Sequence, residues 1–306
     1  MKHLAIAVVD YPSASKSAVY GLLELLELAN NTCQELDAPV RLSTKIYKVE
    51  DLNALEQVQV VILPPCNSAD FYTKNCVELN DFLHRMHTKG AVLASACVGS
   101  FILARAGFLD NKFCTTHWRL AQEFTETFPQ VKLNVNAIMV KEGNVITAGG
   151  RMAWLDLAFE IISSFCSHGV AAKLSKEMVV DTGYREQKFY RQFIPQLDHG
   201  DELILRLQSE LEAKYAQPLL LAEIADQYFV STRTLQRRFH KALGMSVIEY
   251  LQKLRLHNAC QHLELSQKSV SEISYQVGYQ NVNAFRKVFV REYGLTPSEF
   301  RKRFAV

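Results

Sequence analysis

Two stretches near the C-terminal end of the chain repeat one local design, and they constrain its fold more than any other feature. Residues 221–244 are LAEIADQYFVSTRTLQRRFHKALG, and residues 269–301 are SVSEISYQVGYQNVNAFRKVFVREYGLTPSEFR. Each has apolar residues at helical spacing, then a short polar turn, then a helix whose exposed face is cationic. This order predicts two helix-turn-helix units, and a cationic helix of this kind fits the major groove of DNA.

Helical spacing separates the two faces of each unit. The inward faces carry Ile224, Ala225, Leu235, Phe239 and Leu243 in the first unit and Ile273, Val277, Phe285 and Phe289 in the second. Ser231 stands at the N-cap position of the first unit's second helix. The outward faces predict DNA contacts at Thr232, Arg233, Gln236, Arg237, His240, Asn281, Asn283, Arg286 and Lys287. The sequence leaves open whether each side chain bonds a base edge or contacts only phosphate.

The charge of the chain supports a C-terminal part that binds a polyanion. Residues 231–306 contain 13 Lys and Arg against 5 Asp and Glu, whereas residues 1–200 contain 19 against 21. Between the two units, residues 247–263 have the pattern of one helix, about 25 Å long at 1.5 Å per residue. Such a rod could hold two recognition helices about 34 Å apart, which is one turn of B-DNA. Double-stranded DNA is therefore the expected partner.

The first half of the chain alternates strand patterns with helix patterns. Strands are expected at residues 4–9, 58–63, 91–95, 137–141 and 145–148, and helices at 20–30, 77–87, 100–106, 116–128 and 152–164. This alternation predicts a flavodoxin-like α/β domain, with a mostly parallel sheet covered by helices on both faces. Apolar periodicity lapses around Pro195 and Gly200, and every later pattern is helical. We therefore expect an α/β domain over residues 1–195 and an all-α domain over residues 201–306.

Composition gives the expected setting of the protein. No apolar run approaches the roughly 18 residues that span a bilayer, so no membrane is expected as a partner. The apolar run at the N-terminus is interrupted by Asp10 and has the pattern of a strand, not of a signal peptide. The 7 cysteines form neither a CxxC pair nor a Cys/His metal spacing. We expect a cytoplasmic protein with no metal and no cofactor.

Cys97 is the candidate nucleophile in the first half of the chain. Residues 92–101, VLASACVGSF, predict a strand, a turn of small residues that holds this cysteine, and a helix. That is the layout of a nucleophile elbow, in which a strained turn presents the thiol at a helix N-terminus and the helix dipole favours thiolate. The alternative is an ordinary buried cysteine in a strand–helix loop.

Three segments of the C-terminal part match a known pattern. They are STRTLQRRF in the first unit, Tyr250-Leu251 with Arg255-Leu256 and Ala259 between the units, and GYQNVNAFRKVFVREYGLTPSEFR in the second. Together they resemble the AraC family of transcription regulators, over residues 208–304. The family usually has glycine in the first turn, where this chain has Phe229-Val230-Ser231, while Gly278 keeps the glycine in the second. If the first turn needs a positive φ, Phe229 is strained by about 1 kcal/mol.

A second set of matches spans the N-terminal half. It comprises Glu24 and Ala29-Asn30, residues 94–99 (ASACVG), 106–110 (AGFLD), 115–118 (TTHW) and 147–150 (TAGG), and Asp156-Leu157. These residues resemble the PfpI-like branch of the class I glutamine amidotransferase fold. The whole chain resembles the GlxA-type AraC regulators, which join that fold to the AraC module. The resemblance implies a transcription regulator whose first domain senses an effector, and a homodimer, because PfpI-like domains commonly pair.

The resemblance also implies where catalytic groups would stand, and three of them are missing. The acid of the first helix aligns with Ala18, the histidine after the cysteine is replaced by Val98, and a Gly-Gly turn is replaced by Pro64-Pro65-Cys66. Proline has no N–H to donate to an oxyanion, and a thiol without an adjacent base lacks its activator. His117 could replace that base, or it could instead line a pocket or cap a helix. We therefore expect no enzyme activity.

What remains is a pocket that suits a small polar effector. Its expected lining is Cys97, Val98, His117, Trp118 and Arg151. Two other functions stay open on the sequence alone. One is a cysteine-dependent amidase or hydrolase that is tethered to DNA, and the other is a redox sensor that uses Cys97 as its switch.

Overall fold

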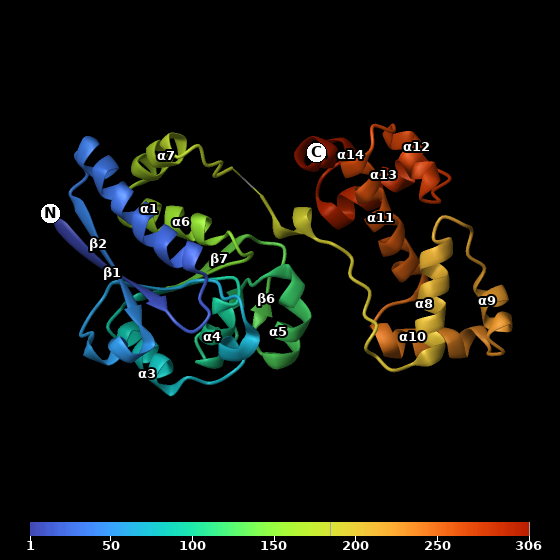
Figure 1. Ribbon diagram of the computed structural model, residues 1–306, viewed down its shortest axis with the longest axis horizontal. Helices are drawn as coiled ribbons and strands as arrows, with labels where there is room; N and C mark the ends of the chain where they lie inside the picture. Colours follow the sequence, from blue (N-terminus) through green and yellow to red (C-terminus); the bar gives the residue numbers. More distant parts are fainter. Residues whose placement is uncertain (184, 306) are drawn as a thin grey trace. The chain divides into compact units, whose positions relative to one another are not determined.

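The computed structural model describes residues 1–183 and 185–305 and divides into two compact units, Met1–Lys188 and Phe189–Val306. The first is a layered α/β domain, and the regular structure described in the second is helical (Figure 1). Residues 189–195, which the sequence assigns to the first domain, belong to the second unit. There the ring of Phe193 lies 5.1 Å from that of Tyr250. The apolar contact of Phe193 assigns this segment to the second unit, although the periodicity of apolar residues ends only around Pro195.

The first unit is built on a six-stranded sheet with the order β2-β1-β3-β4-β8-β7. Its strands are β1 (Lys2–Asp10), β2 (Val40–Lys48), β3 (Val60–Leu63), β4 (Val92–Ala96), β7 (Met139–Glu142) and β8 (Val145–Ala148). Neighbouring strands are parallel except for β7 and β8. All residues of β3 and β8 are buried, because both faces of the sheet are covered. The predicted flavodoxin-like α/β fold is confirmed.

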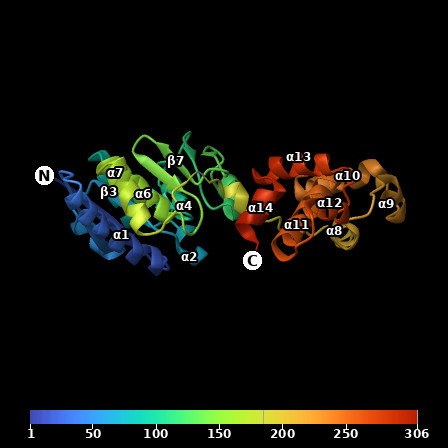
Figure 2. The same ribbon diagram turned by 90° about the horizontal axis from the view of Figure 1, so that it is seen from above.

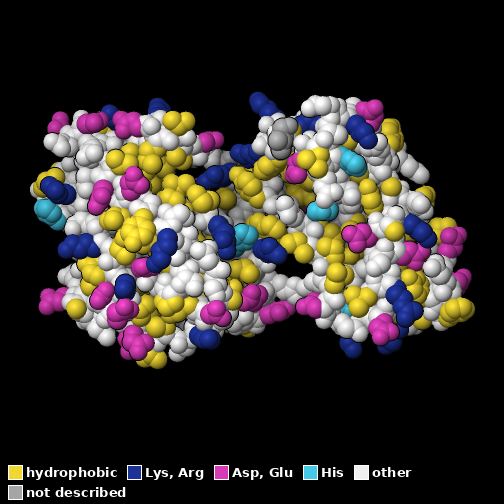
Figure 3. Space-filling model, in the orientation of Figure 1, with side chains coloured by type: hydrophobic (Ala, Val, Ile, Leu, Met, Phe, Trp, Pro, Cys, Tyr) yellow, Lys and Arg dark blue, Asp and Glu magenta, His cyan; other side chains and the backbone are white. Residues whose placement is uncertain are grey.

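Helices cover both faces of this sheet, as Figures 1 and 2 show. On one face α1 (Lys16–Glu35) packs with α6 (Trp154–Phe165) and α7 (His168–Glu177). On the other lie α3 (Val77–Thr88) and α4 (Gly99–Arg105). The shorter elements are η1 (Val49–Ala54), α2 (Ala69–Tyr72), β5 (Phe113–Cys114), η2 (Trp118–Leu120), α5 (Ala121–Thr127) and β6 (Lys132–Leu133). Acidic and basic side chains are interspersed over the face of this unit shown in Figure 3.

The sequence did not predict the short elements η1, α2, β5 and β6, and the structure departs from the sequence-based elements in three longer segments as well. Strand β2 was not predicted because it is an edge strand, VRLSTKIYK, with few apolar residues. Helix α7 was not predicted because Val170 and Leu174 are its only buried apolar residues. The helix predicted over residues 116–128 is wrong in its first part. Thr115 and Thr116 are buried and non-helical, and α5 begins only at Ala121.

The second unit contains seven α-helices among its described residues. They are α8 (Glu202–Lys214), α9 (Leu221–Gln227), α10 (Thr232–Leu243), α11 (Val247–Leu265), α12 (Val270–Gln276), α13 (Val282–Tyr293) and α14 (Pro297–Phe304), and the short η3 (Gln187–Tyr190) precedes them. All nine inward residues predicted from helical spacing are buried. They fall into two separate cores, one around Phe239 and one around Phe289, and α11 supplies residues to both.

Capping residues set the boundaries of the two recognition helices. Ser231 accepts a hydrogen bond from the backbone N–H of Thr234 and begins α10, as predicted, and Asn281 begins α13. Gly244 and Gly294 end these helices with φ angles of 67° and 70°. Only glycine adopts such angles without steric cost, which explains why both helices stop where they do.

Candidate nucleic-acid interface and effector site

Helices α10 and α13 present matching positions to solvent. Their N-caps, Ser231 and Asn281, are 50 residues apart, and so are their terminal glycines, Gly244 and Gly294. The same offset pairs Arg233 with Asn283, Gln236 with Arg286, Arg237 with Lys287 and His240 with Val290, and all eight side chains are exposed. Because positions i, i+3, i+4 and i+7 share one face of a helix, each set forms a single exposed stripe.

Val290 is the member of the second stripe that sequence reasoning missed. It is 39% exposed although it is apolar. The constant offset from His240 was the signal that could have found it. An aliphatic side chain in this position suits contact with the methyl group of thymine.

The cations of the two stripes differ from the neighbouring Arg238 in their ion pairing within the described residues. Arg238 is held by Asp201, the N-cap of α8, at 2.5 and 2.9 Å. Within the described part of the chain, Arg233, Arg237, Arg286 and Lys287 make no ion pair. Their charges are therefore available to phosphate groups.

Asn281 and Thr232 differ from the other predicted contact residues. The side-chain oxygen of Asn281 accepts hydrogen bonds from the backbone N–H groups of Asn283, at 2.8 Å, and Ala284, at 3.0 Å. A bidentate contact with adenine needs both the oxygen and the nitrogen of the amide, so this cap leaves Asn281 only its NH₂ group. Thr232 is the first residue of α10 and is half-buried.

The first unit holds Cys97 in the elbow that the sequence predicted. Cys97 follows β4, precedes α4 and has a φ of 56°, and its backbone N–H donates to the carbonyl of Ala148 at 2.7 Å. The predicted preference for thiolate is wrong. Burial raises the pKa of Cys97 to about 11, outweighing the backbone N–H of Val98 and the charge of Arg151, which lower it. The whole residue is only 3% exposed.

Two positions at which the resemblance implies an activating group, residues 18 and 98, carry none. Ala18 is fully buried in α1, and Val98 is buried beside the thiol. In the loop after β3, the carbonyl of Pro64 accepts a hydrogen bond from the Tyr11 hydroxyl, and the carbonyl of Pro65 accepts one from the backbone N–H of Ser15. Pro64 and Pro65 themselves have no backbone N–H that could donate to an oxyanion.

His117 caps a helix, one of the roles that the sequence left open. Its Nδ1 atom accepts a hydrogen bond from the backbone N–H of Arg119 at 3.1 Å, at the start of η2. Burial lowers its pKa, and the charges of Arg151 and Arg119 lower it further, so the imidazole is neutral at pH 7. The Arg151 charge also lowers the pKa of Cys97 and of Cys66, although burial raises both overall. Arg151 donates to the side-chain oxygen of Asn67 at 3.2 Å.

Gln187 is the residue of this region that no sequence signal revealed. Its Nε2 atom lies 2.9 Å from three acceptors, the Thr115 hydroxyl and the carbonyls of Thr116 and Ala137. Its Oε1 atom accepts from the backbone N–H of Trp118 at 3.0 Å. The side chain is buried, and all these partners are distant in sequence, so only the folded chain brings them together.

Hydrogen bonds join Gln187 to the Cys97 turn. The Thr116 hydroxyl donates to the carbonyl of Cys97 at 2.9 Å, while the Thr116 carbonyl accepts from Gln187. Gly149 permits this packing, because a Cβ atom there would lie 2.8 Å from the Gln187 oxygen. The cysteine turn, the His117–Trp118 segment and the last residues of the first unit thus share one network.

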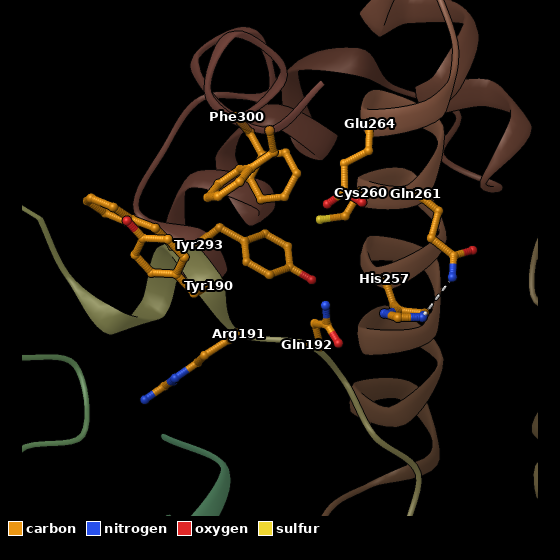
Figure 4. A pocket seen from close by; sticks show the side chains of 11 residues that line it. Tyr190, Arg191, Gln192, His257, Cys260, Gln261, Glu264, Tyr293 and Phe300 are labelled. Atoms are coloured by element: carbon orange, nitrogen blue, oxygen red, sulfur yellow. Dashed lines mark hydrogen bonds between the residues drawn. The ribbon is translucent and has the colours of Figure 1, made fainter. Parts of the chain in front are cut away.

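A cavity of about 250 Å³ lies within the second unit, between the segment 189–192 and helices α11, α13 and α14 (Figure 4). Cys260, Glu264 and Tyr293 line its wall, and His257 and Gln261 share a hydrogen bond of 3.2 Å. Burial raises the pKa of Glu264 and lowers that of His257. The predicted effector-pocket residues lie in the first unit and so do not line this cavity.

The described residues were also compared with the requirements of a membrane-spanning helix and of a metal site. Within residues 1–183 and 185–305, no helix has the length and apolar character needed to cross a bilayer. In the same ranges, no three His, Cys, Asp or Glu side chains group as a metal site would require.

Comparison with known proteins matches both units to families. Residues 32–164 match the DJ-1/PfpI family, and residues 224–303 match a helix-turn-helix domain. A crystal structure from Vibrio parahaemolyticus, provisionally described as a transcriptional regulator, covers 58% of this chain and 100% of its own, with a TM-score of 0.52 and 18% identity. At that identity the likeness supports the fold alone.

Three curated relatives match over most of the chain. The HTH-type transcriptional regulator ArgR of Pseudomonas aeruginosa is 32% identical over 224 residues, 72% of this chain and 67% of its own. GlxA of Rhizobium meliloti is 28% identical over 72% of this chain and 68% of its own. GbdR of Pseudomonas aeruginosa is 29% identical over 72% of this chain, and the match spans 60% of its length. The chain belongs to the GlxA-like family of AraC-type transcriptional regulators, in which a DJ-1/PfpI domain is joined to a helix-turn-helix domain.

Proposed function

We propose that this protein is a sequence-specific DNA-binding transcription regulator that responds to a small-molecule effector. The pair of matching exposed stripes on α10 and α13 carries this proposal. Arg and Lys side chains without protein partners suit phosphate, while Gln236, Asn283 and Arg286 have the groups that recognise base edges. Two such helices in one chain suit two successive major grooves.

We place the effector site in the first unit, at Cys97, Val98, His117, Trp118 and Arg151. A guanidinium, a neutral imidazole and an indole suit a small polar molecule with a hydrogen-bond acceptor. Burial keeps Cys97 protonated, so its thiol serves as a weakly polar wall and not as a nucleophile. We therefore propose a pocket without catalytic activity. The amidase reading needs a base near Cys97, where Val98 and Ala18 offer none.

The Gln187 network supplies a physical route from this pocket to the rest of the chain. Gln187 bonds to Thr115, Thr116 and Trp118 and directly precedes Lys188, the last residue of the first unit. An effector that moves the Thr116–Trp118 segment would change how tightly the exit of the chain is held. Such a ligand shifts DNA binding only if it binds the two arrangements with different affinities.

The oligomeric state and the location of the protein are also part of the proposal. PfpI-like domains commonly pair, so we propose a homodimer. Access to DNA is needed for the function, so we propose a cytoplasmic location. Sedimentation of the purified full-length chain over a concentration series tests the dimer, and a single species of 34.8 kDa at all concentrations would reject it.

The test of the proposed function is a selection from random duplex DNA with the full-length chain. The selected sequence should bind much more tightly than its shuffled version, with an affinity that falls steeply as salt rises. A metabolite screen by thermal shift then looks for ligands, and each hit is retested on Cys97→Ser and on DNA binding. Failure to enrich any sequence would reject the regulator. Turnover of an amide that is abolished by Cys97→Ser would favour the enzyme, and peroxide-dependent loss of DNA binding, reversed by reductant, would favour the redox sensor.

A further inference from the structure

The two helix-turn-helix units have separate cores and are joined at few points. No buried residue is shared between the core around Phe239 and that around Phe289, and Tyr215 is the partly buried residue that packs on both. A groove of about 960 Å³ lies between the units, lined by residues of α9, α11, α12 and α13. Helix α11 passes through both cores, so contacts across this groove act together with α11 on the angle between the two recognition helices.

Arg255, in the middle of α11, joins the two units through its guanidinium group. Its Nε atom donates to the carbonyl of Tyr215 at 2.7 Å, and its Nη2 atom donates to that of Gln217 at 2.8 Å. Both carbonyls belong to the loop between α8 and α9 in the first helix-turn-helix unit. The guanidinium carbon also lies 5.9 Å from the ring centroid of Tyr279, in the turn of the second unit. Two hydrogen bonds and one ring contact thus hold parts of both units.

Gly278 brings the same two segments into direct contact. It has a φ of 88°, and a Cβ atom at this position would lie 2.9 Å from both the carbonyl carbon and the Cα atom of Ala216. The loop between α8 and α9, in the first helix-turn-helix unit, therefore packs on the bare backbone of the turn in the second helix-turn-helix unit. Two other side-chain contacts join α11 and α13, the Lys253–Glu292 ion pair at 3.4 Å and a hydrogen bond of 3.0 Å from Arg291 to Gln252, and both are open to solvent.

We propose that Arg255, seated against the Gly278 turn, is a positioning residue that sets the spacing and angle between the two recognition helices, and so the spacing of the DNA half-sites that the protein accepts. The inference rests on the proposed DNA-binding function. One base pair inserted between half-sites moves the second by about 3.4 Å and turns it by roughly 35°. A rigid pair of helices rejects such a site, whereas a hinged pair adapts to it.

The test measures affinity against half-site spacing. The full-length chain is titrated with the selected duplex, with duplexes that carry one base pair more or fewer between half-sites, and with duplexes that keep one half-site only. For the wild type we expect at least a 30-fold preference for the selected spacing. For Arg255→Met, which keeps the aliphatic stem, that preference should fall below about threefold. Binding to single half-site duplexes should stay within about twofold of wild type, because neither recognition helix is altered.

A matched control separates positioning from loss of stability. Arg301 also donates to two backbone carbonyls, those of Leu263 and Lys268, but both acceptors lie on the side of the second helix-turn-helix unit. Arg301→Met loses the same kind of contact and should keep the full spacing preference. Gly278→Ala, which pushes the same two segments apart, should reduce the preference as Arg255→Met does. Arg255→Lys, which keeps the charge and one donor group, should restore part of it.

Each outcome decides one claim. A spacing preference that survives Arg255→Met, or that Arg301→Met lowers equally, overturns the positioning role. Should Arg255→Met not fold, Arg255→Lys and Gly278→Ala decide, and an unchanged preference in both overturns the role. A wild type that binds no selected sequence rejects the proposed function instead, and this result is distinct from both.

Discussion

Phe229 occupies in the first helix-turn-helix unit the same left-handed backbone position that Gly278 occupies in the second. The φ angles are 53° and 88°. Each residue donates to the helix before it in the same way, Phe229 to the carbonyl of Asp226 and Gly278 to that of Tyr275. Both turns therefore need a positive φ, and the strain expected at Phe229 from the sequence is present.

We predict that Phe229→Gly stabilises the second unit by up to about 1 kcal/mol, since it relieves this strain. The phenyl ring is 97% exposed, so its removal forfeits little packing. Thermal unfolding monitored by circular dichroism measures the change. The control is Phe229→Ala, which removes the ring but keeps the Cβ atom and the strain, and it should be neutral. Equal gains from both variants would place the cost in the exposed ring and not in the backbone.

Cys97 should resist alkylation at neutral pH. With a pKa of about 11, only about one thiol in ten thousand is ionised at pH 7. The rate of labelling by iodoacetamide, followed by mass spectrometry of the Cys97 peptide, should rise steadily from pH 7 to pH 10. The raised pKa also means that the buried thiol contributes stability below about pH 8.5, which is lost as the pH rises towards 11. Rapid labelling at pH 7 would contradict the buried-thiol account and favour the enzyme or redox functions.

The fold was predictable where a segment carries its own pattern. β3 is a continuous apolar run and β8 is apolar except for Thr147, while α10 and α13 have an N-cap, a regular apolar face and a terminal glycine. Strand β2 lacks such a pattern, because its place at the sheet edge comes from pairing with β1. Thr115 and Thr116 lack one as well, since hydrogen bonds to Cys97 and Ala137 decide their conformation.

The candidate sites were predictable to different degrees for the same reason. The exposed stripe of a helix follows from spacing within one segment, so the faces of α10 and α13 were found from the sequence, apart from Val290. Gln187 and Arg255 donate to backbone carbonyls that are remote in sequence. Every residue type has a backbone carbonyl, so the sequence does not reveal which one accepts the hydrogen bond. The pKa of Cys97 depends on how deeply the folded domain buries the thiol. The sequence shows only that the thiol precedes a helix, and this feature alone predicted a lowered pKa where burial raises it.

Gln187→Glu should destabilise the first unit by about 2–4 kcal/mol. The substitution keeps the shape of the side chain but replaces the donor NH₂ with an acceptor that faces the Thr116 and Ala137 carbonyls. Calorimetry should show a lower transition temperature for the first unit and an unchanged one for the second.

A matched control is Gln130→Glu. The Gln130 side chain makes one exposed hydrogen bond, to Asp110, so this substitution should change stability by less than about 0.5 kcal/mol. DNA affinity without effector should be unchanged in both, and a loss of affinity in Gln187→Glu would mean that the network acts on the DNA-binding unit even without ligand.

Arg286→Ala and Asn283→Ala should each weaken binding to the selected DNA by about 1–3 kcal/mol if the side chain reads a base, with relaxed preference at one base pair. A phosphate contact would instead weaken binding to all sequences alike and reduce its salt dependence. Asn281 requires a different comparison, because its side-chain oxygen caps α13. Asn281→Ser keeps a capping oxygen and loses only the NH₂ group, whereas Asn281→Ala also loses the cap and should cost about 1 kcal/mol of stability. Competition titrations against single-base variants of the selected duplex measure these effects. Wild-type affinity in both Arg286→Ala and Asn283→Ala would mean that α13 does not lie in the groove, and the recognition role would then rest on α10 alone.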